Sequence, residues 1–166
     1  SLLTATLKVE GDIAIQIQGE GTLSYAVING THNQRLRGVA RWDEALEVLP
    51  KDFSELVPKG VLVITITPEH GERYQGMVAL DKPTLAECIE AYFEQSEQLA
   101  TKVILRTQLI DNHAKACGMF LQIIPTSSEA TDKADTAFEH LSTMTDTIKN
   151  EELFELTAED ILHRLY

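Results

Sequence analysis

Three arginines at alternate positions of one short segment have the spacing that most strongly suggests a binding site. Arg35, Arg37 and Arg41 lie in QRLRGVAR, together with Val39. In an extended strand, residues two apart share a face, so the three guanidinium groups would lie together. Guanidinium groups bind anions, which predicts an anion site or a contact face for a partner. The alternative is that the three arginines form ion pairs with acidic side chains of the same chain, which has 26 Asp and Glu residues against 14 Lys and Arg.

Nucleophilic and metal chemistry have weaker candidates. Cys88 lies in a predicted helix beside Ile89 and Cys117 opens a predicted strand, which is typical of core thiols rather than nucleophiles. The chain contains no G-x-S-x-G elbow, P-loop or G-x-G-x-x-G. No histidine pairs with another within a helical turn; the five are His32, His70, His113, His140 and His163. We therefore expect a protein that is not an enzyme, binds no metal or cofactor through these residues, and keeps its thiols free, as in the cytoplasm.

Charge and hydropathy exclude further classes. The 166 residues carry a formal net charge of −12, which disfavours binding to nucleic acid and to anionic membranes. The longest apolar run, at 61–66, is too short to span a bilayer. The first ten residues lack the pattern of a signal peptide, and the missing initial Met suggests a fragment.

The elements that must position these residues begin with strands. Apolar residues alternate through DIAIQIQ, and VLVITIT is rich in β-branched residues, so both segments predict strands. Thr84 and Glu87 form a predicted capping box that begins a helix over 84–100. We expect strands at 12–18, 23–28, 34–42, 61–67, 74–80, 102–108 and 117–124, with turns at Asn29-Gly30 and Asp111-Asn112 and about one helical turn within 43–60.

The end of the chain is predicted to be helical. Residues 125–136 contain no large apolar side chain and are interpreted as a polar hinge between an α+β core, 1–124, and a helical segment, 137–166. Thr157 and Asp160 would cap the last helix. The expected fold is α+β, a mainly antiparallel sheet with packed helices. The apolar helical face would pack on the protein's own sheet, or meet a second subunit or an unfolded client; its candidate residues are Phe154, Ile161, Leu162 and Leu165.

Several long motifs stand together in order. They are SLLTATLK, VING, QRLRGVAR, ITITPEHGERYQG, TLAECIEAYFEQSEQL, GMFLQIIP and EELFELTAEDILHRLY, which together extend over almost the whole chain. In these motifs the sequence resembles the 33 kDa chaperonin family, the bacterial redox-regulated heat-shock holdases. The resemblance implies an ATP-independent chaperone that binds unfolding proteins under oxidative or heat stress. It also implies a homodimer that exchanges its helices after the main sheet.

The resemblance further implies segments that this sequence lacks. The family begins with an additional helical segment ahead of Ser1 and ends in a zinc domain with four cysteines beyond Tyr166. Oxidation of those thiolates expels zinc and uncovers apolar surface. Neither Cys88 nor Cys117 matches that motif. Two alternatives remain open: a small-anion or nucleotide-binding module that uses the arginine face, and a structural dimerisation domain that is inactive without the missing tail.

Overall fold

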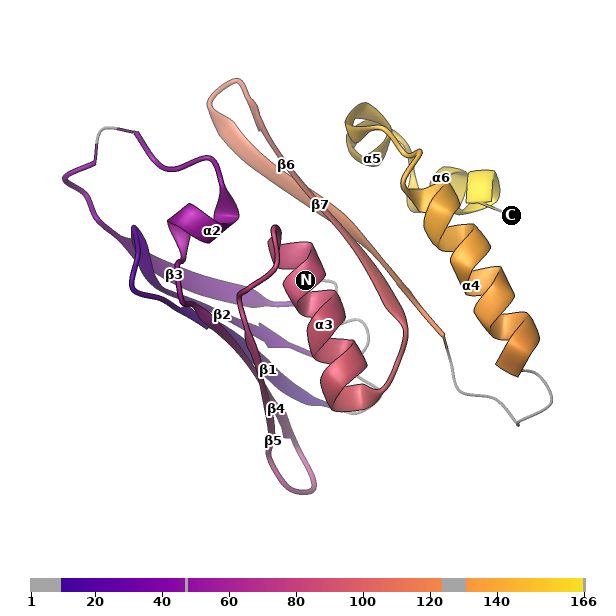
Figure 1. Ribbon diagram of the computed structural model, residues 1–166, viewed down its shortest axis with the longest axis horizontal. Helices are drawn as coiled ribbons and strands as arrows, with labels where there is room; N and C mark the ends of the chain where they lie inside the picture. Colours follow the sequence, from indigo (N-terminus) through magenta and orange to yellow (C-terminus); the bar gives the residue numbers. More distant parts are fainter. Residues whose placement is uncertain (1–9, 47, 124–130, 166) are drawn as a thin grey trace. The chain divides into compact units, whose positions relative to one another are not determined.

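The computed structural model describes residues 10–46, 48–123 and 131–165, with the backbone alone at 131–134. Its contacts divide the chain into two compact units, Ser1–Ser96 and Glu97–Tyr166 (Figure 1). The described part of the first unit is a sheet with two helices, and that of the second is a hairpin with three helices. The α+β fold predicted from the sequence is confirmed.

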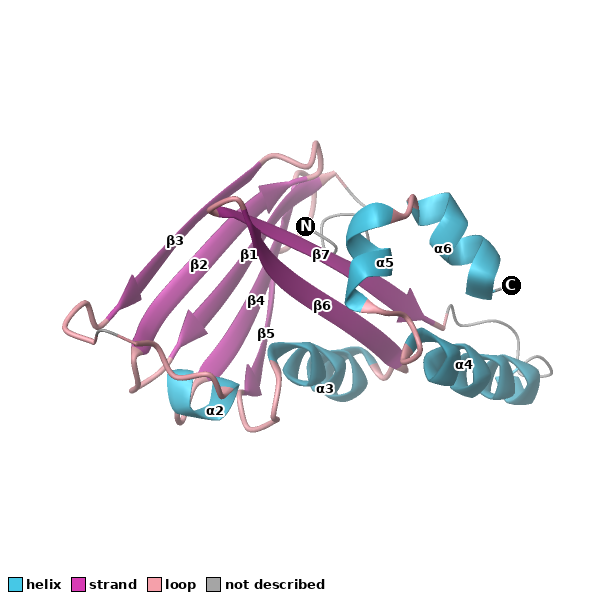
Figure 2. Ribbon diagram, turned by 90° about the horizontal axis from the view of Figure 1, so that it is seen from above, coloured by secondary structure: helices cyan, strands magenta, loops and turns pink. Residues whose placement is uncertain are grey.

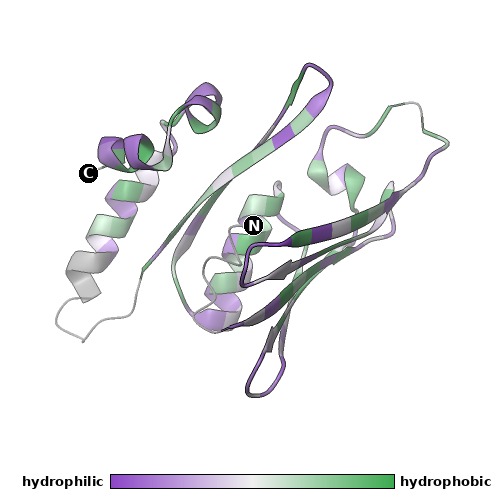
Figure 3. Cartoon of the chain, turned by 180° about the vertical axis from the view of Figure 1, so that it is seen from behind, coloured by the Kyte–Doolittle hydropathy of each residue, from purple (hydrophilic) through white to green (hydrophobic). Residues whose placement is uncertain are grey.

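The first unit is built on a five-stranded sheet in the order β3-β2-β1-β4-β5, in which every neighbouring pair is antiparallel. Hydrophobic and hydrophilic residues alternate along the strands, as Figure 3 shows, and this alternation separates the two faces of the sheet. The strands are β1 (Gly11–Gln18), β2 (Leu23–Thr31), β3 (Leu36–Trp42), β4 (Val61–Pro68) and β5 (Tyr74–Ala79).

One face of the sheet carries the core of this unit. Ile13, Leu62, Ile64 and Val78 share that face by register, and each is at most 6% exposed. Helix α3 (Leu85–Glu97) lies against it (Figure 2), with its buried residues directed inward. The two approach each other closely at Gly76, where an added Cβ would lie 2.5 Å from the ring of Tyr92. Glycine therefore allows the helix to approach the sheet.

Helix α3 begins where the sequence predicts. The Thr84 hydroxyl accepts a hydrogen bond from the Glu87 N–H at 3.2 Å and donates one to the Glu87 carboxylate at 2.7 Å. This confirms the expected N-cap. The short helix α2 (Phe53–Leu56) is the single helical turn expected within 43–60.

The second unit pairs β6 (Thr101–Ile110) with β7 (His113–Gln122) as an antiparallel hairpin. Its turn is at Asp111-Asn112, as expected, and both residues have positive φ, 48° and 61°. Three helices follow: α4 (Thr131–Thr145), α5 (Asn150–Glu155) and α6 (Ala158–Leu165).

One local expectation is wrong. Asn29-Gly30 is not a turn, because β2 continues through it and pairs with Arg37 and Leu36; the chain turns instead near Gln34, whose φ is 59°. Helix α4 begins at Thr131, within the expected hinge 125–136. Residues 126–136 contain no glycine or proline, so nothing in their composition prevents a helix. The remainder of that hinge lies outside the described residues, and the division into core, hinge and helical segment stays a prediction.

Candidate functional site

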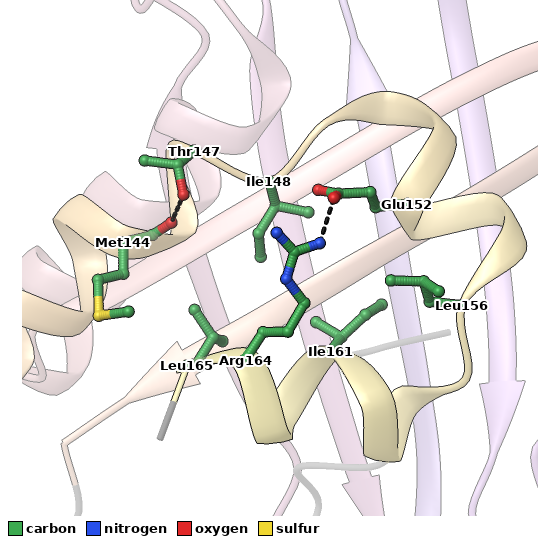
Figure 4. A pocket seen from close by; sticks show the side chains of 8 residues that line it. All are labelled: Met144, Thr147, Ile148, Glu152, Leu156, Ile161, Arg164 and Leu165. Carbon is green, nitrogen blue, oxygen red and sulfur yellow. Dashed lines mark hydrogen bonds and ion pairs between the residues drawn. The ribbon is translucent and has the colours of Figure 1, made fainter.

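Helices α4, α5 and α6 surround a small hollow in the second unit (Figure 4). Its volume is about 190 Å³. Five of its side chains are large and apolar, and a Glu–Arg ion pair lies across it. The lining residues are Met144, Thr147, Ile148, Glu152, Leu156, Ile161, Arg164 and Leu165.

The start of α6 is fixed by the capping box predicted from the sequence. The Thr157 hydroxyl accepts a hydrogen bond from the Asp160 N–H at 3.1 Å and donates one to the Asp160 carboxylate at 2.7 Å. These bonds satisfy polar groups at the first turn of the helix. They orient α6 so that Ile161 and Leu165, four residues apart, face the hollow (Figure 4).

Glu152 connects the two short helices. Its carboxylate accepts a hydrogen bond from the Lys149 N–H at 2.9 Å and forms an ion pair with the Arg164 guanidinium. The Lys149 N–H, and secondly Arg164, hold the pKa of the Glu152 carboxyl below its usual range. Both partners stabilise the charged form, so Glu152 is a carboxylate at neutral pH.

Polar contacts also attach the helices to the hairpin. Arg106 Nε on β6 donates to Asn150 Oδ1 at 2.6 Å, and Lys102 Nζ lies 2.9 Å from the Asp146 carboxylate. Both acceptors lie at or near the junction of α4 and α5. These contacts position the junction on the hairpin, and with it the hollow.

The four residues predicted for a client or dimer surface do not share one outward face. Leu165 is 8% exposed and lines the hollow with Ile161, whereas Leu162 is 51% exposed and does not line it. Phe154, on α5, is half-buried and does not line the hollow. Helical periodicity identified the apolar residues but not which of them pack inside the unit. Their role in a client or dimer surface stays a prediction.

The predicted arginine row is brought together on one sheet edge. Arg37 and Arg41 lie on β3, opposite Asn29 and Tyr25 of β2, and Arg35 directly precedes the strand. All three arginines are exposed. In the described part of the chain, none of them forms an ion pair with an acidic side chain. The alternative, in which the arginines form ion pairs with the chain's own acidic side chains, is therefore not observed in the described part of the chain.

A second hollow, of about 440 Å³, lies at the Arg35 end of this edge. Two guanidinium groups, an amide and two hydroxyls contribute to its lining, and one carboxylate opposes them. Those side chains belong to Arg35, Arg37, Asn29, Thr31, Thr67 and Asp12. Such a set could bind an anion or the polar side chains of a polypeptide.

The thiols offer little reactivity. Cys88 is 0% exposed in α3, and burial raises its pKa. Burial also raises the pKa of Cys117, partly opposed by Arg106. A raised pKa leaves less of the reactive thiolate at neutral pH. Among the described residues no group of three or more His, Cys, Asp or Glu side chains could hold a metal ion. The zinc that the resemblance implies has no ligand set among those residues.

These features define an α+β domain with an exposed arginine-bearing sheet edge. Within the described residues, no helix is long and apolar enough to cross a membrane. A sequence model of the family described as Hsp33 protein matches residues 1–166. The chain therefore belongs to the Hsp33 family.

Relatives of known name agree with this assignment. The chain is 77% identical to a protein of Pseudoalteromonas atlantica and 54% identical to one of Photorhabdus laumondii, both named 33 kDa chaperonin. Each match covers 100% of this chain and 56% of the relative, so the chain spans about half the length of these proteins.

A solved structure shows the same fold. The crystal structure of a 33 kDa chaperonin, a heat shock protein 33 homolog from Thermotoga maritima, superposes with a TM-score of 0.78 at 22% identity. That match covers 99% of this chain and 58% of the other.

Proposed function

We propose that this chain is the client-holding part of an ATP-independent chaperone in the cytoplasm. It binds unfolding proteins during heat or oxidative stress and prevents their aggregation. Membership of the Hsp33 family and relatives named 33 kDa chaperonin support this function. The chain does this by binding alone and is not an enzyme.

The observation that carries the proposal is a concentration of exposed apolar side chains. In the described part of the chain, twelve large apolar residues are at least 37% exposed, and six of them lie between residues 36 and 49. Exposed apolar surface marks binding sites for other polypeptides, and Leu36 and Trp42 share one face of β3 while Val39 lies on the other. The six are Leu36, Val39, Trp42, Leu46, Val48 and Leu49.

Redox control and dimerisation are further parts of the proposal. Zinc release from the cysteine domain that the resemblance implies would uncover client-binding surface in the complete protein. A homodimer that exchanges the helices α4–α6 is favoured by the polar segment before them. Phe154, Ile161, Leu162 and Leu165 are the residues proposed for that contact or for clients.

Light scattering from a thermally aggregating client enzyme tests the function. The chain is added at increasing molar ratio, once in reductant and once in peroxide. Suppression in both conditions is expected, because the apolar side chains at 36–49 are exposed whatever the redox state. Suppression only after peroxide would assign a switch to Cys88 or Cys117. A folded chain that suppresses nothing in either condition would overturn the proposal for this segment.

A matched pair of variants locates the surface. Trp42→Ser with Val48→Ser removes two side chains, 51% and 77% exposed, from the apolar concentration. Leu109→Ser removes a side chain that is 68% exposed on the hairpin of the other unit. A higher molar ratio of the first variant to client should be needed for the same suppression of aggregation. The second variant should suppress aggregation at the same molar ratio as the parent chain.

The second hollow favours one alternative function, a small-anion or nucleotide site that uses Arg35, Arg37 and Arg41. Its lining includes two of these guanidinium groups. A bound ligand stabilises the folded state by mass action. Thermal unfolding with phosphate or a nucleotide, compared with sodium chloride at equal ionic strength, tests this function: a ligand-specific rise in Tm would support it.

A further inference from the structure

Strand β3 ends the five-stranded sheet and has only β2 as a described neighbour. Thr31 N–H donates to the Arg35 carbonyl at 3.0 Å, and Arg35 N–H donates to the Thr31 hydroxyl at 3.3 Å, so the backbone of Arg35 faces β2. In an antiparallel ladder, alternate residues direct their N–H and C=O groups to the same neighbour. The backbone groups of Leu36, Gly38 and Ala40 therefore point away from β2.

The two faces of this edge differ in chemistry. Arg35, Arg37 and Arg41 are on one face, and Leu36 and Trp42 are on the other. Leu36 and Trp42 are each 51% exposed, and every residue of β3 is exposed. Natural sheets protect their edges with charged side chains, proline, a bulge or a cover. Strand β3 contains no proline, and the one register shift in its pairing falls on the β2 side, between Leu23 and Tyr25.

The arginines determine what this edge can accept. Two copies of β3 that paired edge to edge would place their arginine rows on one continuous face, and like charges across strands are destabilising. A strand with acidic side chains on that face would instead find opposite charges. The net charge of −12 belongs to the chain as a whole, but Coulomb interactions beyond about 8 Å are screened at physiological salt. The local guanidinium groups therefore decide whether β3 prefers an acidic or a basic segment.

We propose that β3 binds an extended acidic segment of an unfolded polypeptide as an additional strand of the sheet. Acidic side chains of the segment lie beside Arg37 and Arg41, and its alternate apolar side chains lie beside Leu36 and Trp42. Backbone hydrogen bonds to Leu36, Gly38 and Ala40 supply affinity that is independent of sequence. This inference rests on the proposed chaperone function, because it specifies which client segments are bound and where.

Three labelled peptides test the mode of binding by fluorescence anisotropy. The first alternates glutamate and valine over eight residues, the second replaces each glutamate by lysine, and the third carries prolines at two central positions of the first. We expect the glutamate peptide to bind about tenfold more tightly than the lysine peptide, the ratio falling as salt rises. The proline peptide should bind weakly, because proline donates no backbone hydrogen bond.

Variants of the edge assign the site. Arg37→Glu with Arg41→Glu should reverse the preference and favour the lysine peptide. Arg37→Gln with Arg41→Gln should make the affinities for the glutamate and lysine peptides equal. This variant replaces the charge-reversal variant if the latter does not fold. Arg73→Glu is the matched control, since Arg73 is exposed directly before the opposite edge strand, β5, and should leave the preference unchanged.

A backbone variant separates strand addition from simple charge attraction. Ala40→Pro removes an outward N–H, and proline is tolerated on edge strands at such positions. Circular dichroism should show an intact sheet, while affinity for the glutamate peptide falls at least about fivefold.

The outcomes separate this inference from the proposed function. If the parent chain suppresses client aggregation but the glutamate:lysine ratio is unaffected by the arginine variants, the edge site is wrong and the chaperone function stands. Unchanged peptide affinity in a folded Ala40→Pro variant would also overturn strand addition. If the parent chain fails to suppress aggregation of any client yet binds the glutamate peptide at β3, the edge site stands and the chaperone function of this segment fails.

Discussion

The contact between Gly76 and Tyr92 predicts that a single methyl group will destabilise the first unit. A Cβ at Gly76 would lie 2.5 Å from Tyr92 Cε2, 2.8 Å from its hydroxyl oxygen and 3.0 Å from Cζ. Tyr92 is 1% exposed, so its ring has no open space into which it can move. Its ring also meets that of Phe93 edge-on, with centroids 5.3 Å apart. Gly76→Ala must therefore displace α3 from the sheet.

Two opposing effects set the size of the change. Overpacking a well-packed core costs about 1–3 kcal/mol. Replacing glycine by alanine reduces the entropy of the unfolded chain and contributes about 0.4–1 kcal/mol in the other direction. We expect Gly76→Ala to lower the free energy of unfolding by about 1–2 kcal/mol. With a urea m-value of about 2 kcal/mol/M, the midpoint falls by about 0.5–1 M.

Urea unfolding followed by circular dichroism and by the fluorescence of Trp42, the one tryptophan of the chain, measures this change. Tyr92→Leu, combined with Gly76→Ala, removes the ring, and the two changes should couple by at least about 0.5 kcal/mol. Gly38→Ala is the control, because its Cβ would lie 3.1 Å from the Val27 carbonyl oxygen and 3.3 Å from the exposed Ile28 side chain, which is a looser fit than the 2.5 Å approach at Gly76. Equal effects of Gly76→Ala with and without the Tyr92 ring would refute the steric explanation.

Three further predictions concern the core, the thiols and the helix cluster. Leu62→Ala, at a side chain 0% exposed, should lower the free energy of unfolding in urea by about 2–5 kcal/mol, and a loss below about 1 kcal/mol would contradict its core position. An alkylating reagent at pH 8, read by mass spectrometry, should modify half-buried Cys117 before fully buried Cys88, with both equally reactive in urea; the reverse order would contradict the observed burial. Since the folded state lowers the pKa of Glu152, its carboxylate stabilises the fold above the ordinary value of 4.5 and loses this effect as pH falls through the lower folded pKa. The stability difference between the parent and Glu152→Gln should therefore be greatest near pH 7 and shrink in acid, and a difference constant with pH would contradict the stabilisation of the carboxylate by the Lys149 N–H and Arg164.

The strands and their caps could be predicted because their signals are local. Alternation in DIAIQIQ specified β1, and the side chains of Thr84 and Glu87 specified the start of α3. Local signals do not distinguish the two candidate turns, because Asn-Gly and Asp-Asn both tolerate positive φ. Asp111-Asn112 turns, whereas Asn29-Gly30 is extended because β3 pairs with it in register. That pairing is a long-range property and leaves no mark at the two residues themselves.

The candidate site shows the same division between local and long-range information. A period of two placed the arginines of 35–41 on one face, and the structure confirms that placement. A helical period likewise identified Ile161, Leu162 and Leu165 as apolar, yet two of them line the hollow and Leu162 does not. Periodicity gives the direction of a side chain relative to its own element. Which other element that side chain meets depends on long-range contacts, such as the hydrogen bond between Arg106 and Asn150, which are 44 positions apart.

The exposed apolar side chains around β3 follow from the width of the sheet. Five strands about 4.8 Å apart span roughly 19 Å, whereas one helix with its side chains is only about 10–12 Å across. Helix α3 lies at the β5 side, where Gly76 meets Tyr92, and cannot also cover β2 and β3. The side chains on this face accordingly pass from buried Leu62 to Ile28 and Leu36, which are 45% and 51% exposed. An unfolded segment added to β3 would extend the sheet, and its apolar side chains would join this uncovered strip while its acidic side chains met the arginines on the other face of β3.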